Sequence, residues 1–146
     1  MKVIYPGSFN PWTLGHQSIL NRCLELFEEV QITVAMNPDK DVSPGFITWT
    51  LKPLESEQVT VDTCYDLVSQ YGLPIVRGVR SGDWEYEQNL AQWNRELGVE
   101  TLFLCPDPSL AHVNSTAVRT LHHLGQEDKA RQFVGNDLIY YRWLNG

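Results

Sequence analysis

The sequence predicts an α/β fold of the Rossmann-like, doubly wound kind, with a mainly five-stranded parallel sheet and helices on both faces. Short apolar runs alternate along the chain with longer stretches whose apolar residues recur at helical spacing. Turn-forming Gly, Pro, Asn and Asp residues separate these segments. The chain has 146 residues and is 42% hydrophobic, which suits one core, so we expect a single domain over residues 1–146.

Five short apolar segments, rich in Val, Ile and Thr, have the composition of buried strands. They cover residues 2–5, 31–36, 59–61, 74–76 and 100–105. Because helical segments separate them, right-handed crossovers should join them into a parallel sheet. In such sheets, ligands bind beyond the carboxyl ends of the strands, where the strand order reverses.

Helices are expected wherever the apolar residues follow the helical period. They cover residues 13–29, 64–71, 84–97 and 115–124, and a last one begins near residue 135. The first should bury Ile19, Leu20, Cys23, Leu26, Phe27 and Val30, and the third Leu90, Ala91, Trp93, Asn94 and Leu97. Residues 41–58 contain Pro44, Gly45 and Pro53 and show no period, so we expect a loop with a short extended piece at 46–50.

The composition excludes several classes of function. A formal net charge of −7 argues against nonspecific binding to nucleic acid or to a membrane. The sequence has no signal-peptide pattern and no bilayer-spanning apolar run, so we expect a soluble, cytoplasmic protein. Cys23, Cys64 and Cys105 are widely spaced and are expected to be reduced core residues, not a metal site or a disulfide framework.

The stretch from Tyr5 to His16, YPGSFNPWTLGH, has the pattern of a phosphate-binding turn. It joins a buried strand to a helix start through Gly, Pro and Asn residues. Unpaired backbone N–H groups and the helix dipole favour an anion at such a position. Thr13 and His16 lie three residues apart, so both side chains should point toward the anion.

Three more loops at the same edge carry hydrogen-bond donors. Together with the stretch at 5–16, these loops would bring together Ser8, Thr13, His16, Lys40, Arg77, Arg80, Ser115, Thr116 and Arg119. Taken singly, His16 could be a capping residue, Lys40 a solvated turn residue, and Glu87 part of a solvated helix face. A set of donors without a protein nucleophile suits nucleotidyl transfer, in which the substrate supplies the nucleophile and the protein positions it and neutralises charge.

The chain resembles the phosphopantetheine adenylyltransferases of the T/HxGH nucleotidylyltransferase superfamily. Five motifs carry the resemblance in order: YPGSFNPWTLGH at 5–16, VRGVR at 76–80, WEYEQNLAQWNR at 84–95, NSTAVR at 114–119 and QFV at 132–134. The resemblance implies transfer of AMP from ATP to 4′-phosphopantetheine, with Mg²⁺ accompanying ATP. The products would be dephospho-coenzyme A and pyrophosphate, and the family suggests a homo-oligomer, usually a hexamer.

The resemblance also implies roles for individual residues. His16 would stabilise the transition state, with Thr13, Lys40 and Arg80 completing the catalytic set. The acceptor would be held by Ser8, Lys40, Cys64 and Arg77. ATP would be bound by Ser8, Phe9, His16, Gly78, Val79, Arg80, Glu87, Leu110, Ala111, His112, Val113, Asn114, Ser115 and Thr116.

The chain departs from the family pattern at several points. Ser8 replaces Thr, Asn10 replaces Asp, and Asn114 replaces the first Ser of the phosphate loop. The segment after Lys40 is shortened, so the helix found there in the family is expected to be missing. Two alternatives stay open: adenylyl transfer to another phosphate acceptor such as nicotinamide mononucleotide, and a non-catalytic nucleotide or coenzyme A binding module.

Overall fold

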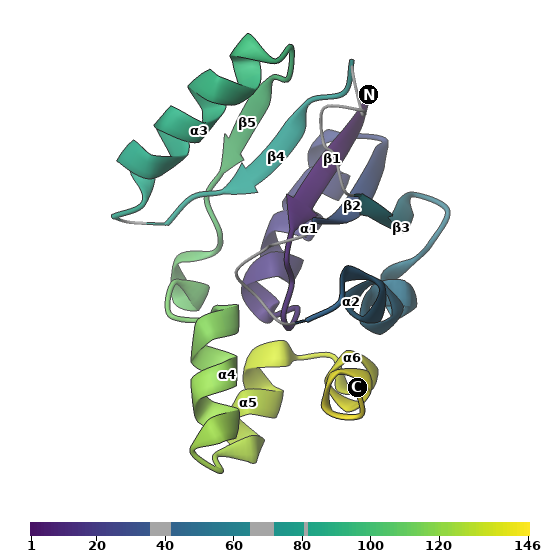
Figure 1. Cartoon of the computed structure of the whole chain (residues 1–146), viewed down its shortest axis with the longest axis vertical. Helices are drawn as coiled ribbons and strands as arrows, with labels where there is room; N and C mark the ends of the chain where they lie inside the picture. The colour runs from purple at the N-terminus through teal and green to yellow at the C-terminus, as the bar shows by residue number, and fades with distance from the viewer. Residues whose placement is uncertain (36–41, 65–71, 81) are drawn as a thin grey trace.

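The computed structural model describes residues 1–35, 42–64, 72–80 and 82–146, and at its centre is a five-stranded parallel sheet (Figure 1). The strands are β1 (Lys2–Gly7), β2 (Glu29–Ala35), β3 (Val59–Cys64), β4 (Ile75–Gly78) and β5 (Thr101–Leu104). Their order across the sheet is β3-β2-β1-β4-β5, and every neighbouring pair is parallel. The predicted fold class is confirmed.

The strand order reverses at β1, which lies between β2 and β4. Helix α1 (Leu14–Leu26) joins β1 to β2, and α3 (Trp84–Glu96) joins β4 to β5. Because right-handed crossovers on the two sides of a reversal run over opposite faces, these two helices cover opposite faces of the sheet. The carboxyl ends of β1 and β4 therefore form the crevice in which a ligand is expected.

Three helices follow β5 and gather below the carboxyl ends of the strands (Figure 1). They are α4 (Ser115–His123), α5 (Glu127–Val134) and α6 (Asp137–Leu144). Val118, Val134 and Ile139 are fully buried and belong to the same apolar cluster as the central strands. The carboxy-terminal helices are thus packed into the same apolar core as the central strands.

Asparagine side chains cap two of the carboxy-terminal helices. The Asn114 side chain accepts from the backbone N–H of Ala117 at 2.8 Å, and α4 begins at the next residue. Asn136 caps α6 in the same way. Helix α5, which was not predicted from the sequence, ends at Val134, and Gly135 follows as its C-cap with φ +76°; an added Cβ there would clash with the Leu14 side chain.

The first predicted helix is wrong at its end. Helix α1 stops at Leu26, and β2 begins at Glu29, two residues before the predicted strand. Val30 belongs to β2, where it pairs with Val3 and Val59, and Leu26 is exposed. A buried strand follows the helix after two residues, and its first apolar residue happens to fall at helical spacing from those of α1. The helical pattern in the sequence therefore extends beyond the helix itself.

The loop predicted for residues 41–58 is also wrong, because α2 (Pro44–Leu51) lies within it, followed by the 3-10 turn η1 (Lys52–Leu54). Ser43 caps α2, and Pro44 occupies the first turn, where its missing N–H costs nothing. Ile47 and Leu51 are buried as α2 packs against β2, β3 and α6. The helix expected to be missing is therefore present in short form, because tertiary packing overrides weak helix propensity.

Three other expectations are tested by burial. Leu90, Ala91 and Asn94 of α3 are partly buried, as predicted. Trp93 and Leu97, which follows the helix, are exposed, and Glu87, which was not among the predicted inner residues, is buried. Cys23 is buried as expected, but Cys105 is exposed because β5 ends one residue earlier. The predicted helix at 64–71 falls largely outside the described residues, and its first residue, Cys64, closes β3. None of the described helices is long and apolar enough to cross a bilayer.

Candidate active site

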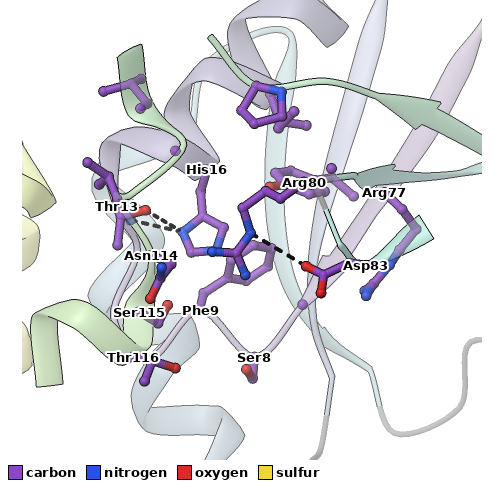
Figure 2. Close-up of a pocket in the computed structure, with 18 of the residues that line it drawn as sticks. Ser8, Phe9, Thr13, His16, Arg77, Arg80, Asp83, Asn114, Ser115 and Thr116 are labelled. Carbon is purple, nitrogen blue, oxygen red and sulfur yellow. Dashed lines mark hydrogen bonds and ion pairs between the residues drawn. The ribbon is translucent and has the colours of Figure 1, made fainter. Parts of the chain in front are cut away.

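A cavity of about 300 Å³ opens beyond the carboxyl ends of β1 and β4 (Figure 2). The turn after β1 forms one wall, the end of β4 and the start of α3 a second, and the start of α4 a third. The switch point predicted from the sequence is the place where this cavity lies. The described part of its lining contains both the turn at residues 5–16 and the arginines after β4.

His16 lies in the first turn of α1 with its imidazole fixed by Thr13. The Thr13 backbone N–H donates to His16 Nδ1 at 3.0 Å, and the Thr13 hydroxyl oxygen lies 3.1 Å from the same nitrogen (Figure 2). Because the backbone group can only donate, Nδ1 carries no proton. A neutral His16 therefore carries its proton on Nε2, which is left to donate to a ligand.

Burial and charge keep His16 neutral. Burial, together with the nearby Arg80 charge, lowers the pKa of His16 from its ordinary value of 6.5 to about 3. The imidazole at neutral pH is thus a hydrogen-bond donor of fixed tautomer and not a cation. Such a group can stabilise charge on a phosphate oxygen without passing a proton.

Two aromatic rings hold the imidazole from its sides. The Phe9 ring meets it edge to face at 5.1 Å between centroids, and the Trp12 ring lies tilted at 5.3 Å. Phe9 is buried at φ +46°, an unusual conformation for a side chain of this size. An added Cβ on Gly7 would lie 2.8 Å from the Phe9 ring, so the turn needs glycine there.

Gly15 allows α1 to approach the third wall closely. A Cβ on this residue would lie 2.7 Å from the backbone oxygen of Val113, just before α4. Any larger residue would push apart the His16 turn and the loop that leads to α4. The glycine beside His16 therefore sets the width of the cavity.

Arg80 and Asp83 form an exposed ion pair at the rim of the cavity. Arg80 Nε lies 3.8 Å from the Asp83 carboxylate, and both side chains are about half exposed. In Figure 2 the Arg80 guanidinium extends beside the imidazole of His16. A long, solvent-exposed pair of this kind is weak, so a phosphate can compete for the guanidinium.

Arg77 and Glu87 form a tighter pair deeper in the same wall. Arg77 Nε donates to one carboxylate oxygen of Glu87 at 3.1 Å, and Nη2 donates to the other at 2.9 Å. The side chain of Glu87 is only 7% exposed. The bidentate bond to Glu87 raises the pKa of Arg77. Glu87 is thus not a solvated helix residue, and its pairing with Arg77 defines the inner face of α3.

The third wall is joined to the turn after β1 by side chains of α4. Ser115 Oγ donates to the backbone oxygen of Pro11 at 2.7 Å. Arg119 donates to the backbone oxygen of Asn10 at 2.6 Å and to Thr116 Oγ1 at 3.2 Å. The two segments that the sequence suggests for phosphate binding are therefore one hydrogen-bonded unit.

Most of the predicted site residues meet at this cavity. Its lining includes Ser8, Phe9, Thr13, His16, Arg77, Gly78, Arg80, Glu87, Leu110, Val113, Asn114, Ser115, Thr116 and Arg119. Val79, Ala111 and His112 do not line it; His112 is exposed and its ring contacts Phe133. Lys40 lies outside the described residues, and for Cys64 only the backbone, at the end of β3, is described.

Thr13 differs from its expected orientation. Its side chain is fully buried, and its hydroxyl oxygen lies against His16 Nδ1. Asp83, Gly15 and Pro106 also line the cavity and were not predicted from the sequence to do so. Asp83 could have been found from its position three residues after Arg80, a spacing that suits an ion pair at a helix start. Gly15 acts through the close approach of two backbone segments, which a single sequence does not reveal.

Among the described residues, the carboxylates that line the cavity are engaged by arginines. Asp83 and Glu87 both line it, and each is paired with an arginine. Among the described residues, no group of three His, Cys, Asp or Glu side chains could hold a metal. The residues that surround the cavity suit an anion better than a cation.

Comparison with known proteins gives three findings. The cytidylyltransferase-like family model matches residues 4–58, the segment that holds the His16 turn. The chain is 38% identical over 143 residues to a phosphopantetheine adenylyltransferase of Porphyromonas gingivalis, covering 85% of this chain and 88% of that protein. It is 40% identical over 134 residues to the enzyme of the same name from Pasteurella multocida, covering 82% and 84% respectively.

Solved structures show the same fold at low sequence identity. A bifunctional NMN adenylyltransferase/ADP ribose pyrophosphatase from Francisella tularensis matches with a TM-score of 0.54 at 12% identity, covering 95% of this chain and 51% of that one. The NadR protein in complex with NR matches with a TM-score of 0.53 at 17% identity, covering 82% and 39%. Both likenesses support the Rossmann-like fold of this chain.

Proposed function

The chain belongs to the phosphopantetheine adenylyltransferases, and from this premise we infer how its site carries out the reaction. The enzyme transfers AMP from ATP to 4′-phosphopantetheine, giving dephospho-coenzyme A and pyrophosphate, a step of coenzyme A biosynthesis. An oxygen of the acceptor phosphate attacks the α-phosphorus of ATP. A bond forms between that oxygen and the α-phosphorus. The bond from the α-phosphorus to the oxygen that bridges the α- and β-phosphates breaks, and pyrophosphate leaves.

The observation that carries the mechanism is the fixed tautomer of His16. With Nδ1 accepting from the Thr13 backbone, Nε2–H is available to the α-phosphate. Negative charge on the equatorial oxygens of the transition state is then met by a preorganised neutral donor. No general base is needed, because a phosphate monoester is largely a dianion at neutral pH and already carries the attacking oxygen.

The arginines have separate tasks in this mechanism. Glu87 occupies Nε and Nη2 of Arg77, which leaves Nη1 for the acceptor phosphate. Lys40 and Ser8 complete that subsite. Arg80 exchanges its weak bond to Asp83 for the phosphates of ATP, and the start of α4 binds the rest of the triphosphate. Bringing two polyanions together needs cations on both, since they otherwise repel.

Mg²⁺ arrives with ATP as part of the substrate. Of the residues that the structure describes, Asp83 and Glu87 are the carboxylates that line the cavity, and arginines engage both, which supports this assignment. We expect the enzyme to work in the cytoplasm. Exposed Tyr86 and Trp93 of α3, together with Leu97 just after it, support a homo-oligomer, a hexamer as in the family. Light scattering after size-exclusion chromatography measures the assembly.

The test is pyrophosphate release from a mixture of the protein, ATP and Mg²⁺ with each of two acceptors. With 4′-phosphopantetheine we expect release that saturates with both substrates. Nicotinamide mononucleotide serves as the matched acceptor, and we expect release at least about a hundredfold slower, because its phosphate lacks the pantetheine arm. Faster release with the mononucleotide contradicts the acceptor assignment, and ATP binding without release from either acceptor indicates a binding module.

A further inference from the structure

The side chain of Asn10 receives a hydrogen bond from the far end of the chain. Trp143 Nε1, on α6, donates to Asn10 Oδ1 at 2.8 Å, and 133 positions separate the two residues. Asn10 is only 6% exposed, so its amide oxygen needs a partner inside the protein. The indole N–H of Trp143 supplies that partner.

Asn10 is also the residue that orients Arg119. The Asn10 backbone oxygen accepts from Arg119 Nη1 at 2.6 Å, and Arg119 Nη2 donates to Thr116. Arg119 and Thr116 both line the cavity, whereas the described residues of α6 contribute nothing to its lining. Asn10 thus connects a helix remote from the cavity to a cation at its rim.

Trp143 is itself fixed in place. Its ring lies 5.4 Å from His122 of α4, edge to face, and 6.1 Å from Tyr140 of α6. Contacts with α4 and with a neighbour on its own helix therefore orient the indole N–H toward Asn10. A donor that is already oriented restricts its acceptor more than a mobile one does.

We propose that Trp143 is a positioning residue for ATP binding, which acts by holding Asn10 so that Arg119 faces the triphosphate. This inference rests on the proposed function. Trp143 and Asn10 do not line the cavity, so the loss of their hydrogen bond should change the affinity for ATP and not the rate of the chemical step. Without the indole N–H, the Asn10 side chain loses its hydrogen bond, and the position of the Asn10 backbone oxygen is less restrained. Arg119, which donates to that oxygen, is then held less firmly at the rim of the cavity.

The test compares Trp143→Phe, which keeps a ring and removes the donor, with Tyr141→Phe as the matched control on the exposed side of α6. We expect Trp143→Phe to weaken ATP binding about fivefold, by calorimetry and as KM, while kcat at saturating ATP changes less than about twofold. Tyr141→Phe should behave as the unmodified protein. A fall in Tm with unchanged ATP affinity, or a fall in kcat with unchanged KM, overturns the proposal.

A double-mutant cycle with Asn10→Ala identifies the route. Because both changes remove the same hydrogen bond, the double variant should bind ATP no more weakly than the weaker single variant; additive losses contradict the route. If Asn10→Ala does not fold, Trp143→Phe alone decides. Calorimetry separates the two proposals, because it needs no turnover. A wild-type protein that binds no ATP overturns the proposed function along with this one, whereas normal wild-type binding with unaltered variants overturns this one alone.

Discussion

The two main walls of the cavity are held by different kinds of interaction. On the α1 side, His16 is fixed by uncharged hydrogen bonds from Thr13 and by the rings of Phe9 and Trp12. On the β4 side, Arg77 and Arg80 are held by ion pairs to carboxylates. The first wall needs no change when a substrate binds, whereas the second holds cations that phosphates can take over. The comparison separates a preset transition-state contact from adjustable substrate contacts.

The largest effect is expected from His16→Ala, which removes the preset contact. We expect kcat to fall by about 10²–10³, with ATP affinity changed far less, because the contact strengthens only as charge develops at the α-phosphorus. Steady-state kinetics and ATP calorimetry measure the two quantities. His16→Gln, which keeps a side-chain donor, serves as the control and should recover part of the loss. An equal loss in kcat and in ATP affinity would make His16 a plain binding residue.

Arg77→Ala tests the β4 side of the cavity at the tighter of its two ion pairs, the one between Arg77 and Glu87. We expect KM for the acceptor to rise at least about tenfold while KM for ATP changes little, since a charge-assisted bond to the acceptor phosphate is lost. The variant also leaves Glu87 buried and unpaired, so its Tm should fall.

The double change Arg77→Ala with Glu87→Gln controls for that instability. It removes the stranded charge and should restore much of the Tm, but not the acceptor KM. A larger rise in KM for ATP than for the acceptor would mean that the tasks of Arg77 and Arg80 are exchanged.

The residues of the two walls could be predicted from the sequence only in part. The sheet and its switch point follow from apolar runs and turn residues, which are local signals, and they place His16, Arg77 and Arg80 at one edge. The pairing of Arg77 with Glu87 was not predicted, because the inner face of α3 depends on where the helix meets the sheet. The bond from Trp143 to Asn10 had no local signal at all.

The α2 segment shows the same limit from the other direction. Its Pro and Gly residues and its β-branched residues weaken helix propensity, so sequence alone favoured a loop. The helix forms because Ile47 and Leu51 are buried between the sheet and α6. Long-range packing decides such segments, and a single sequence does not reveal it.

The pH dependence of the free energy of unfolding reports on His16, on the α1 side of the cavity. The folded protein keeps His16 neutral down to a pKa of about 3, whereas the unfolded chain protonates it near 6.5. Between these values the unfolded state binds one more proton, so the stability due to His16 is fully present above pH 6.5 and is lost as pH falls toward 3. Urea unfolding from pH 7 to pH 4 should show this loss. His16→Gln should reduce the slope by about one proton, and an unchanged slope contradicts a buried neutral imidazole.

The smallest effect is expected at the weak ion pair between Arg80 and Asp83, on the β4 side of the cavity. Asp83→Asn removes a negative charge from the rim of a cavity that receives a polyanion, and it releases Arg80 from a bond that is worth under about 1 kcal/mol. We therefore expect KM for ATP to fall about twofold at low salt, with the gain vanishing near 0.5 M salt as screening shortens to a few Å. Glu85→Gln is the matched control, because Glu85 is an exposed carboxylate in the first turn of α3 that does not line the cavity. If Asp83→Asn instead raises KM for ATP, Asp83 holds Arg80 in its binding position, and the β4 wall is as preset as the wall of α1.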